Sequence, residues 1–154
     1  MGRMWNETKA RRNLEYGIWN MIASKSFTDL EVWKVGHELV VQVYDVTKSF
    51  PKEELFGLTS QMKRSSASIT SNIAEGFGRF GLKEKEQFYL IAAGSLFELK
   101  DQLLIARDVG YISPAQFKTV AENCTSCHKL LNAFITKHRV IRNSKFKIPD
   151  SGRR

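Results

Sequence analysis

The stretch CTSCH at residues 124–128 has the residue types and spacing of a c-type haem attachment motif. Two cysteines three residues apart are also typical of zinc sites, provided that further ligands lie nearby. The remaining possibility is structural, because a free cysteine packs in a protein core as a small apolar side chain. The choice among these depends on the element that carries the motif and on the compartment of the protein.

The motif lies on a predicted helix that runs from Ser113 to about His138. Ser113 is a favourable N-cap, Pro114 suits the first helical position, and Gln116 can complete a capping box. His128 lies about 100° around this helix from Cys127. The apolar stripe follows alternating spacings of three and four residues: Phe117, Val120, Cys124, Cys127, Leu131, Phe134 and His138.

This placement favours core packing for both thiols. Covalent haem attachment normally requires export, and the N-terminal sequence MGRMWNETKARRNLEYG has no apolar segment of a secretory signal. We therefore expect a cytoplasmic protein, in which thiols stay reduced. A zinc site would need a further ligand from His37 or His138, and a disulfide within a helix would be strained. The sequence predicts buried, reduced, metal-free thiols and no cofactor.

No other group of residues forms a catalytic set. The acidic pairs Glu53–Glu54, Glu84–Glu86 and Glu98–Asp101 are spaced as solvated helix faces rather than as an opposed acid and base. The glycines of GFGRFG at residues 76–81 follow no strand, so they predict a turn rather than a phosphate-binding loop. His37 lies on a helical stripe and is interpreted as a packing residue. We expect a protein that is not an enzyme, with no catalytic or metal-binding residues.

Four helices are expected in all. The first runs from Thr28–Asp29 to Phe50, before Pro51, and the second from about Lys52 to Phe77. The third runs from Leu82 to about Val109, and Gly110 is the expected left-handed C-cap residue. Because the connections are only a few residues long, sequential helices must run antiparallel, which predicts an all-α up-down-up-down four-helix bundle. Each helix is expected to place one apolar stripe in the core. On the first helix the stripe is Leu30, Trp33, His37, Val40, Tyr44 and Thr47. On the second it is Leu55, Leu58, Met62, Ser65, Ile69, Ile73 and Phe77, and on the third it is Phe88, Ala92, Ser95, Leu99, Leu103 and Ala106.

A line of polar residues runs beside the stripe of the second helix, and a similar line follows the third. Buried polar groups need hydrogen-bond partners, so the two lines either meet inside the bundle and fix its register or face a subunit interface. A ligand site is the third possibility. The second helix contributes Gln61, Arg64 or Ser65, Ser68, Asn72 and Glu75, and the third contributes Ser95, Glu98 and Gln102.

The net charge of +8 belongs to the ends of the chain. Residues 1–26 have five basic and two acidic side chains, and residues 137–154 have seven and one, whereas residues 27–136 have twelve and thirteen. Basic tails commonly bind polyanions such as nucleic acid, or they only keep a protein soluble. We expect a basic extension over 1–26 that is weakly ordered or disordered, a bundle over 27–138, and a disordered basic tail over 139–154. No apolar run is long enough to cross a membrane.

The segments FGLTSQMKRS, SNIAEGFGR and GSLFELKDQL resemble those of the four-helix-bundle proteins of the 23S rRNA intervening-sequence (S23) family. The resemblance covers residue 27 to about 138. It implies a compact bundle that assembles into a cyclic homopentamer. Thr70 stands where the family commonly has proline, and CTSCH lies where members vary widely.

Members of the family were first noticed as reading frames inside insertions in large-subunit ribosomal RNA genes, which does not make them structural components of the ribosome. Related small basic bundles act as accessory factors beside reverse transcriptases, where they bind protein and nucleic acid. The resemblance therefore implies that the chain has itself as a partner, with RNA or DNA and a reverse transcriptase or other protein as further candidates.

Three functions follow as hypotheses. The first is a homo-oligomeric bundle that binds RNA or DNA through the phosphate backbone, the second is a scaffold for another protein, and the third is a haem or metal redox protein. The residues expected to bind nucleic acid are Lys63, Arg64, Arg79, Lys83, Lys85, Arg139, Arg142, Lys145 and Lys147.

Overall fold

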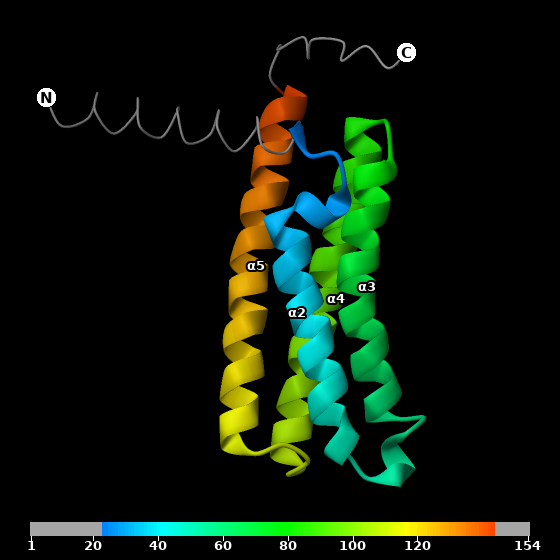
Figure 1. The fold of residues 1–154 in the computed structure, drawn as a ribbon, viewed down its shortest axis with the longest axis vertical. Coiled ribbons are helices and arrows are strands. Elements are labelled where there is room, and N and C mark those ends of the chain that lie inside the picture. Colours follow the sequence, from blue (N-terminus) through cyan, green and yellow to red (C-terminus); the bar gives the residue numbers. More distant parts are fainter. Residues whose placement is uncertain (1–22, 144–154) are drawn as a thin grey trace, which may run out of the picture.

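Four long helices make up nearly all of residues 23–143, the part of the chain that the computed structural model describes (Figure 1). The helices are α2 (Glu31–Val46), α3 (Leu58–Gly78), α4 (Leu82–Asp108) and α5 (Pro114–Asn143). Short 3-10 turns at Phe27–Asp29, Thr47–Ser49 and Lys52–Glu54 complete the regular structure, and the described residues contain no strand. The expectations for residues 1–22 and 144–154 lie outside the described residues.

The predicted caps between α4 and α5 are confirmed. Gly110 has a φ of +78°, and the amides of Gly110 and Tyr111 donate to the carbonyls of Arg107 and Ala106 at 3.0 and 2.9 Å. These two bonds form a Schellman motif, which ends α4. Ser113 and Gln116 then exchange the two bonds of a capping box, at 2.9 and 3.2 Å. α5 continues to Asn143, five residues beyond its expected end, so Arg139 and Arg142 belong to a helix and not to a tail.

The first two helices begin later than the sequence predicted. The side chain of Ser26 caps the 3-10 turn Phe27–Asp29, accepting from the amide of Thr28 at 3.2 Å, and α2 starts only at Glu31. Pro51 is followed by another 3-10 turn, and α3 starts at Leu58, whose amide donates to the Glu54 carboxylate at 2.9 Å. In both cases a local side-chain bond stabilises a tighter turn before the helix.

The core stripe predicted for the first helix is confirmed at its ends, Leu30 and Thr47, and is wrong by about one residue between them. The buried residues of α2 are Val32, Gly36, Leu39, Val43 and Val46, whereas His37 and Tyr44 are exposed. His37 stacks on the Trp33 ring, with centroids 4.9 Å apart, instead of packing in the core. The valines make α2 apolar on two neighbouring faces, and periodicity alone did not distinguish between them. Gly36 determines which of the two faces packs inward. A Cβ at this position would lie 3.2 Å from Thr70 Cγ2 of α3, so the glycine face is the one that fits against α3.

The stripes of the other three helices are confirmed in their central parts. Met62, Ile69 and Ile73 of α3 are fully buried, and they share one core with the stripes of α4 and α5. Leu55, the first residue of the second stripe, is 55% exposed because it precedes α3. α2 and α4 each pack on α3 and α5, which places α2 and α4 on opposite sides of the core. Within residues 23–143, no helix is long and apolar enough to cross a membrane.

The connections lie at two ends of the bundle (Figure 1). Tyr111, after α4, donates to Glu54 at 3.1 Å and its ring lies 5.4 Å from that of Phe50, so the α2–α3 and α4–α5 connections lie together. At the opposite end, the first turns of α4 contact the last turns of α5 through Glu86. The start of α2 and the α3–α4 turn lie at this second end as well.

Gly76 of α3 is expected to be intolerant of a side chain. A Cβ at this position would lie 2.5 Å from Tyr89 Cε1 and 3.1 Å from the Lys85 carbonyl of α4. Overpacking of this kind destabilises a protein by about 1–3 kcal/mol. We predict that Gly76→Ala lowers the free energy of unfolding by this amount in urea denaturation. The matched control is Gly78→Ala, which meets nothing within 4 Å, and an equal loss in both variants would contradict the close α3–α4 contact.

Candidate nucleic-acid interface

The CTSCH cysteines lie in the core of the bundle. Cys124 and Cys127 are fully buried and free, and burial raises their pKa values to about 12 and about 11. His128 is half-buried on another face of α5, where its ring contacts Phe97 edge-on at 5.0 Å and its Nε2 bonds Asn132 at 3.0 Å. Residues 23–143 contain no group of three histidine, cysteine or acidic residues placed to hold a metal ion. The thiols therefore pack as predicted, and the histidine that completes the motif points away from them.

The two predicted polar lines meet between α3 and α4. Ser65 Oγ donates to Gln102 Oε1 at 2.7 Å, and the hydroxyls of Ser68 and Ser95 lie 2.8 Å apart. At the solvent edge, Arg64 donates to Glu98 at 2.8 Å, and Glu98 also accepts from Gln102 at 3.2 Å. Because these pairs join specific positions of the two helices, they fix the register of α3 on α4. The hydrogen-bonded interior is thus confirmed for Ser65, Ser68, Ser95 and Gln102, whereas Asn72 bonds Ser68 of its own helix, Glu75 pairs with Arg79, and Gln61 is exposed.

The residues expected to bind nucleic acid do not form a single patch. Lys63 and Arg64 lie far along α3 from its C-terminal end, with Lys63 Nζ 4.9 Å from the centroid of the Tyr44 ring. Arg79, Lys83, Lys85, Arg139 and Arg142 gather instead at the end of the bundle that carries the α3–α4 turn. Lys145 and Lys147 lie outside the described residues.

Two of the cations at this end, Arg79 and Lys85, stabilise the turn between α3 and α4. The guanidinium of Arg79 pairs with Glu75 of α3 and, at 3.2 Å, with Glu84 of α4, and it lies 4.9 Å from the centroid of the Phe88 ring. Lys85 donates to the Phe77 carbonyl at 2.7 Å and to that of Gly76 at 3.2 Å. A cation at this position satisfies the last carbonyls of α3 and interacts favourably with its dipole. Both side chains hold the α3–α4 turn in place, whereas Lys83 is exposed on the surface.

Arg139 and Arg142 both bind Glu86, whose side chain is only 8% exposed. Arg139 Nε donates to one carboxylate oxygen at 2.6 Å and Arg142 to the other. The hydrogen bond from Arg139 and the charge of Arg142 hold the pKa of Glu86 below its ordinary value. The side chains of the two arginines remain 48% and 31% exposed, so each still presents donors to solvent. One carboxylate thus orients two cations on the last turns of α5.

Sequence reasoning missed the role of Glu86, although a signal was present. The residue continues the buried positions of α4 at helical spacing, before Tyr89, Ala92 and Leu96. An acidic residue on an apolar stripe requires a partner, and here the partners come from the last turns of α5. The neighbouring His138 is fully buried, as its stripe predicted, and neither ring nitrogen has a hydrogen-bond partner. Burial lowers the pKa of His138.

The net positive charge of residues 25–142 comes from this end, because basic and acidic side chains balance in the rest of the bundle. Residues 25–34, 75–86 and 137–142 together have eight basic and five acidic side chains, whereas the remaining residues between 35 and 136 have eight of each. In the sequence outside the described residues, residues 1–22 have four basic and two acidic side chains, and residues 144–154 have four and one. We refer to residues 25–34, 75–86 and 137–142 as the basic end.

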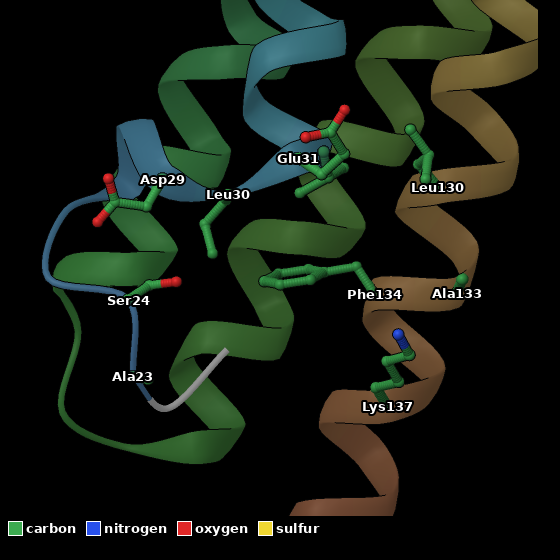
Figure 2. A pocket seen from close by; sticks show the side chains of 10 residues that line it. Ala23, Ser24, Asp29, Leu30, Glu31, Leu130, Ala133, Phe134 and Lys137 are labelled. Carbon is green, nitrogen blue, oxygen red and sulfur yellow. The ribbon is translucent and has the colours of Figure 1, made fainter. Parts of the chain in front are cut away.

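A cleft of about 550 Å³ opens between the start of α2 and the side of α5. Figure 2 shows the side chains of Leu30 and Phe134 pointing toward each other across it, with Lys137 beside them. Of the carboxylates on its α2 side, Asp29 accepts from the Ser26 amide at 3.0 Å and Glu31 pairs with Lys34 at 3.8 Å. The cleft is therefore lined by apolar side chains of both segments, with the charged groups of Asp29, Glu31 and Lys137 beside them.

The fold and its charges define a class of protein: a small helical bundle with a hydrogen-bonded interior and one cationic end. The sequence profile of the 23S rRNA-intervening sequence protein family matches residues 28–133, and the chain belongs to this family. A crystal structure at 1.70 Å of a protein of unknown function from the S23 ribosomal protein family, from Bacteroides thetaiotaomicron VPI-5482, has the same fold. It shares 23% sequence identity with a TM-score of 0.63, over 68% of this chain and 95% of that one. A search of curated proteins gave no match.

The two thiols are expected to be inaccessible in the folded protein. Because they are fully buried and their pKa values are raised, the reactive thiolate is almost absent at pH 8. We predict no reaction of the native protein with Ellman's reagent, and two thiols per chain after unfolding in guanidinium. The protein purified from cells that mature c-type cytochromes should also lack a Soret band. Rapid reaction of the native protein would contradict the core position of Cys124 and Cys127.

Proposed function

We propose that the protein is a non-enzymatic, homo-oligomeric accessory protein that binds RNA or DNA through the phosphate backbone. The observation that carries this proposal is the concentration of the net charge of the described residues at the basic end, and the sequences before and after the described residues are basic as well. Contacts between phosphates and lysine or arginine release counterions, and this supplies most of the affinity of binding that does not depend on sequence. The exposed donors of Arg139 and Arg142, together with Lys83, are the described groups at this end that suit the role.

Two apolar surfaces on opposite sides of the bundle support assembly. The outer face of α4 leaves Leu90, Ile91, Phe97, Leu104 and Ile105 between 43% and 56% exposed. The outer face of α2 leaves Val41 57% and Tyr44 47% exposed, in line with the half-buried Trp33 and Val40.

Two different patches on opposite sides suit a heterologous contact, in which the α4 face of one copy covers the α2 face of the next. Such contacts close into rings when the rotation allows it. The finer architecture that we propose is an up-down-up-down bundle assembled as a cyclic homopentamer; the number five comes from the family resemblance. A ring would repeat the basic end on every copy, so that weak phosphate contacts add through avidity.

The alternative is a scaffold whose partner is a protein, such as a reverse transcriptase, with the charge serving solubility. The exposed apolar faces would then be covered by that partner. A stoichiometric protein partner that is recovered from cell extract after nuclease treatment, together with no affinity of the purified chain for nucleic acid, would favour this alternative.

Charge reversal at the basic end is the test of nucleic-acid binding. We predict that Lys83→Glu, Lys145→Glu and Lys147→Glu combined weaken binding of a labelled single-stranded RNA by at least about tenfold in 100 mM salt, and reduce the slope of log K against log [salt] by about 2. The matched control is Lys48→Glu, Lys52→Glu and Lys118→Glu, the same change in charge at the opposite end. Fluorescence anisotropy between 50 and 300 mM salt measures both quantities. Equal losses for the two triple variants, or affinity that does not change with salt, would contradict the proposal.

Complementary variants test the assembly. We predict that Phe97→Asp on α4 and Tyr44→Asp on α2 each dissociate the oligomer, because each removes one side of every contact. An equimolar mixture of the two variants retains one intact pair of faces and should give heterodimers of twice the 17.6 kDa chain mass. Light scattering after size exclusion measures the mass. A wild-type monomer, or an oligomer that survives Tyr44→Asp, would exclude the heterologous ring.

A further inference from the structure

Phe80 lies at the tip of the three-residue turn that joins α3 to α4, and it is 89% exposed. An aromatic side chain that is so exposed contributes almost no hydrophobic stabilisation to the fold, because it buries almost no apolar surface. The turn that carries it is well fixed. Arg79, the preceding residue, pairs with Glu75 and Glu84 on the two flanking helices, and Lys85 binds the last carbonyls of α3. The exposed ring is thus presented on a rigid support, which limits the entropy lost when a ligand binds.

The charges at the end that carries Phe80 indicate what it binds. Residues 75–86 have three basic and three acidic side chains, and the positive excess at this end comes from Lys137, Arg139 and Arg142 of α5. Lys83, the second residue of α4, is exposed, and Glu86 lies about one helical turn further along the same helix. Glu86 in turn holds Arg139 and Arg142 at the same end. Phe56, at the opposite end of the bundle, is equally exposed at 91%, but it follows the acidic pair Glu53–Glu54. Of these two exposed phenylalanines, only Phe80 therefore lies at the end where a polyanion would be held.

We propose that Phe80 is a stacking platform for an unpaired base of single-stranded nucleic acid. The inference rests on the proposed function and adds the class of ligand to it. Aromatic rings bind single strands by stacking on successive bases while basic side chains hold the backbone, and the preference for sequence is weak because every base has a π-face. Bases inside a duplex are already stacked, so the platform favours single strands over duplexes.

The position of Phe80 is compatible with the proposed ring. The two apolar faces that the homo-oligomer would bury lie along α2 and α4, whereas the α3–α4 turn, which contains Phe80, lies at the end of the bundle (Figure 1). Cyclic symmetry would repeat the ring of Phe80 once per copy. A strand long enough to reach several copies would gain affinity through avidity.

The experiment compares Phe80→Ala, Phe80→Trp and Phe56→Ala in the full-length chain, with circular dichroism to verify folding. Three probes are titrated by anisotropy or competition: a uridine 20-mer, a DNA duplex of equal length, and heparin, a polyanion without bases. Loss of one stacked base weakens binding by about 5- to 150-fold. We expect Phe80→Ala to weaken binding of the uridine 20-mer within this range and to leave heparin binding unchanged. Phe56→Ala should match wild type with every probe, and Phe80→Trp should retain affinity and lose indole fluorescence as the base stacks.

Each other outcome has a defined meaning. Unchanged binding of the uridine 20-mer by Phe80→Ala, or an equal loss of heparin binding, overturns the stacking platform while the electrostatic function stands. Wild-type protein that binds neither the 20-mer nor heparin overturns the proposed function and the platform together. Loss of a protein partner in Phe80→Ala, with nucleic-acid binding intact, would assign the exposed ring to protein docking instead.

Discussion

The close packing of α3 on α4 is the constraint on which the rest of the structure depends. Small residues allow the two helices to approach, and Gly76 does so where the Tyr89 ring fills the space that a Cβ would need. Between them, Ser65 with Gln102 and Ser68 with Ser95 replace apolar contacts by hydrogen bonds. A hydrogen-bonded pair is satisfied in one register only, and a slip would leave buried polar groups without partners. The polar interior therefore specifies how the helices align.

That alignment also determines the basic end. Because α3 and α4 are held in register, the turn between them is short, and Arg79 reaches an acid on each side of it. The first turns of α4 then place Glu86 against the last turns of α5. A buried carboxylate requires cations or donors, and it obtains both from Arg139 and Arg142. The same ion pairs that complete the packing leave guanidinium groups at the surface, so stability and surface charge have a common origin.

α2 and α4 each have a second apolar face that lies outside the core. Each helix packs one face inward and leaves a second apolar face in water, on opposite sides of the bundle. Contiguous exposed apolar surface on a small protein marks an interaction site. The bundle therefore combines an apolar core, hydrogen-bonded pairs between α3 and α4, two exposed apolar sides and one cationic end.

The sequence by itself determined the family, the four helices, the caps around Gly110 and Ser113, and the burial of both cysteines of CTSCH. These features depend on local spacing and on side chains that bond within one turn, so they can be read without a partner element. The pairing of the two polar lines was one of three open alternatives, and only the packed helices decided it. The inward face of α2, the helical position of Arg139 and Arg142, and the role of Glu86 also required the tertiary structure. In each case the deciding contact joins helices that are distant in the chain: Gly36 with Thr70, and Glu86 with the end of α5.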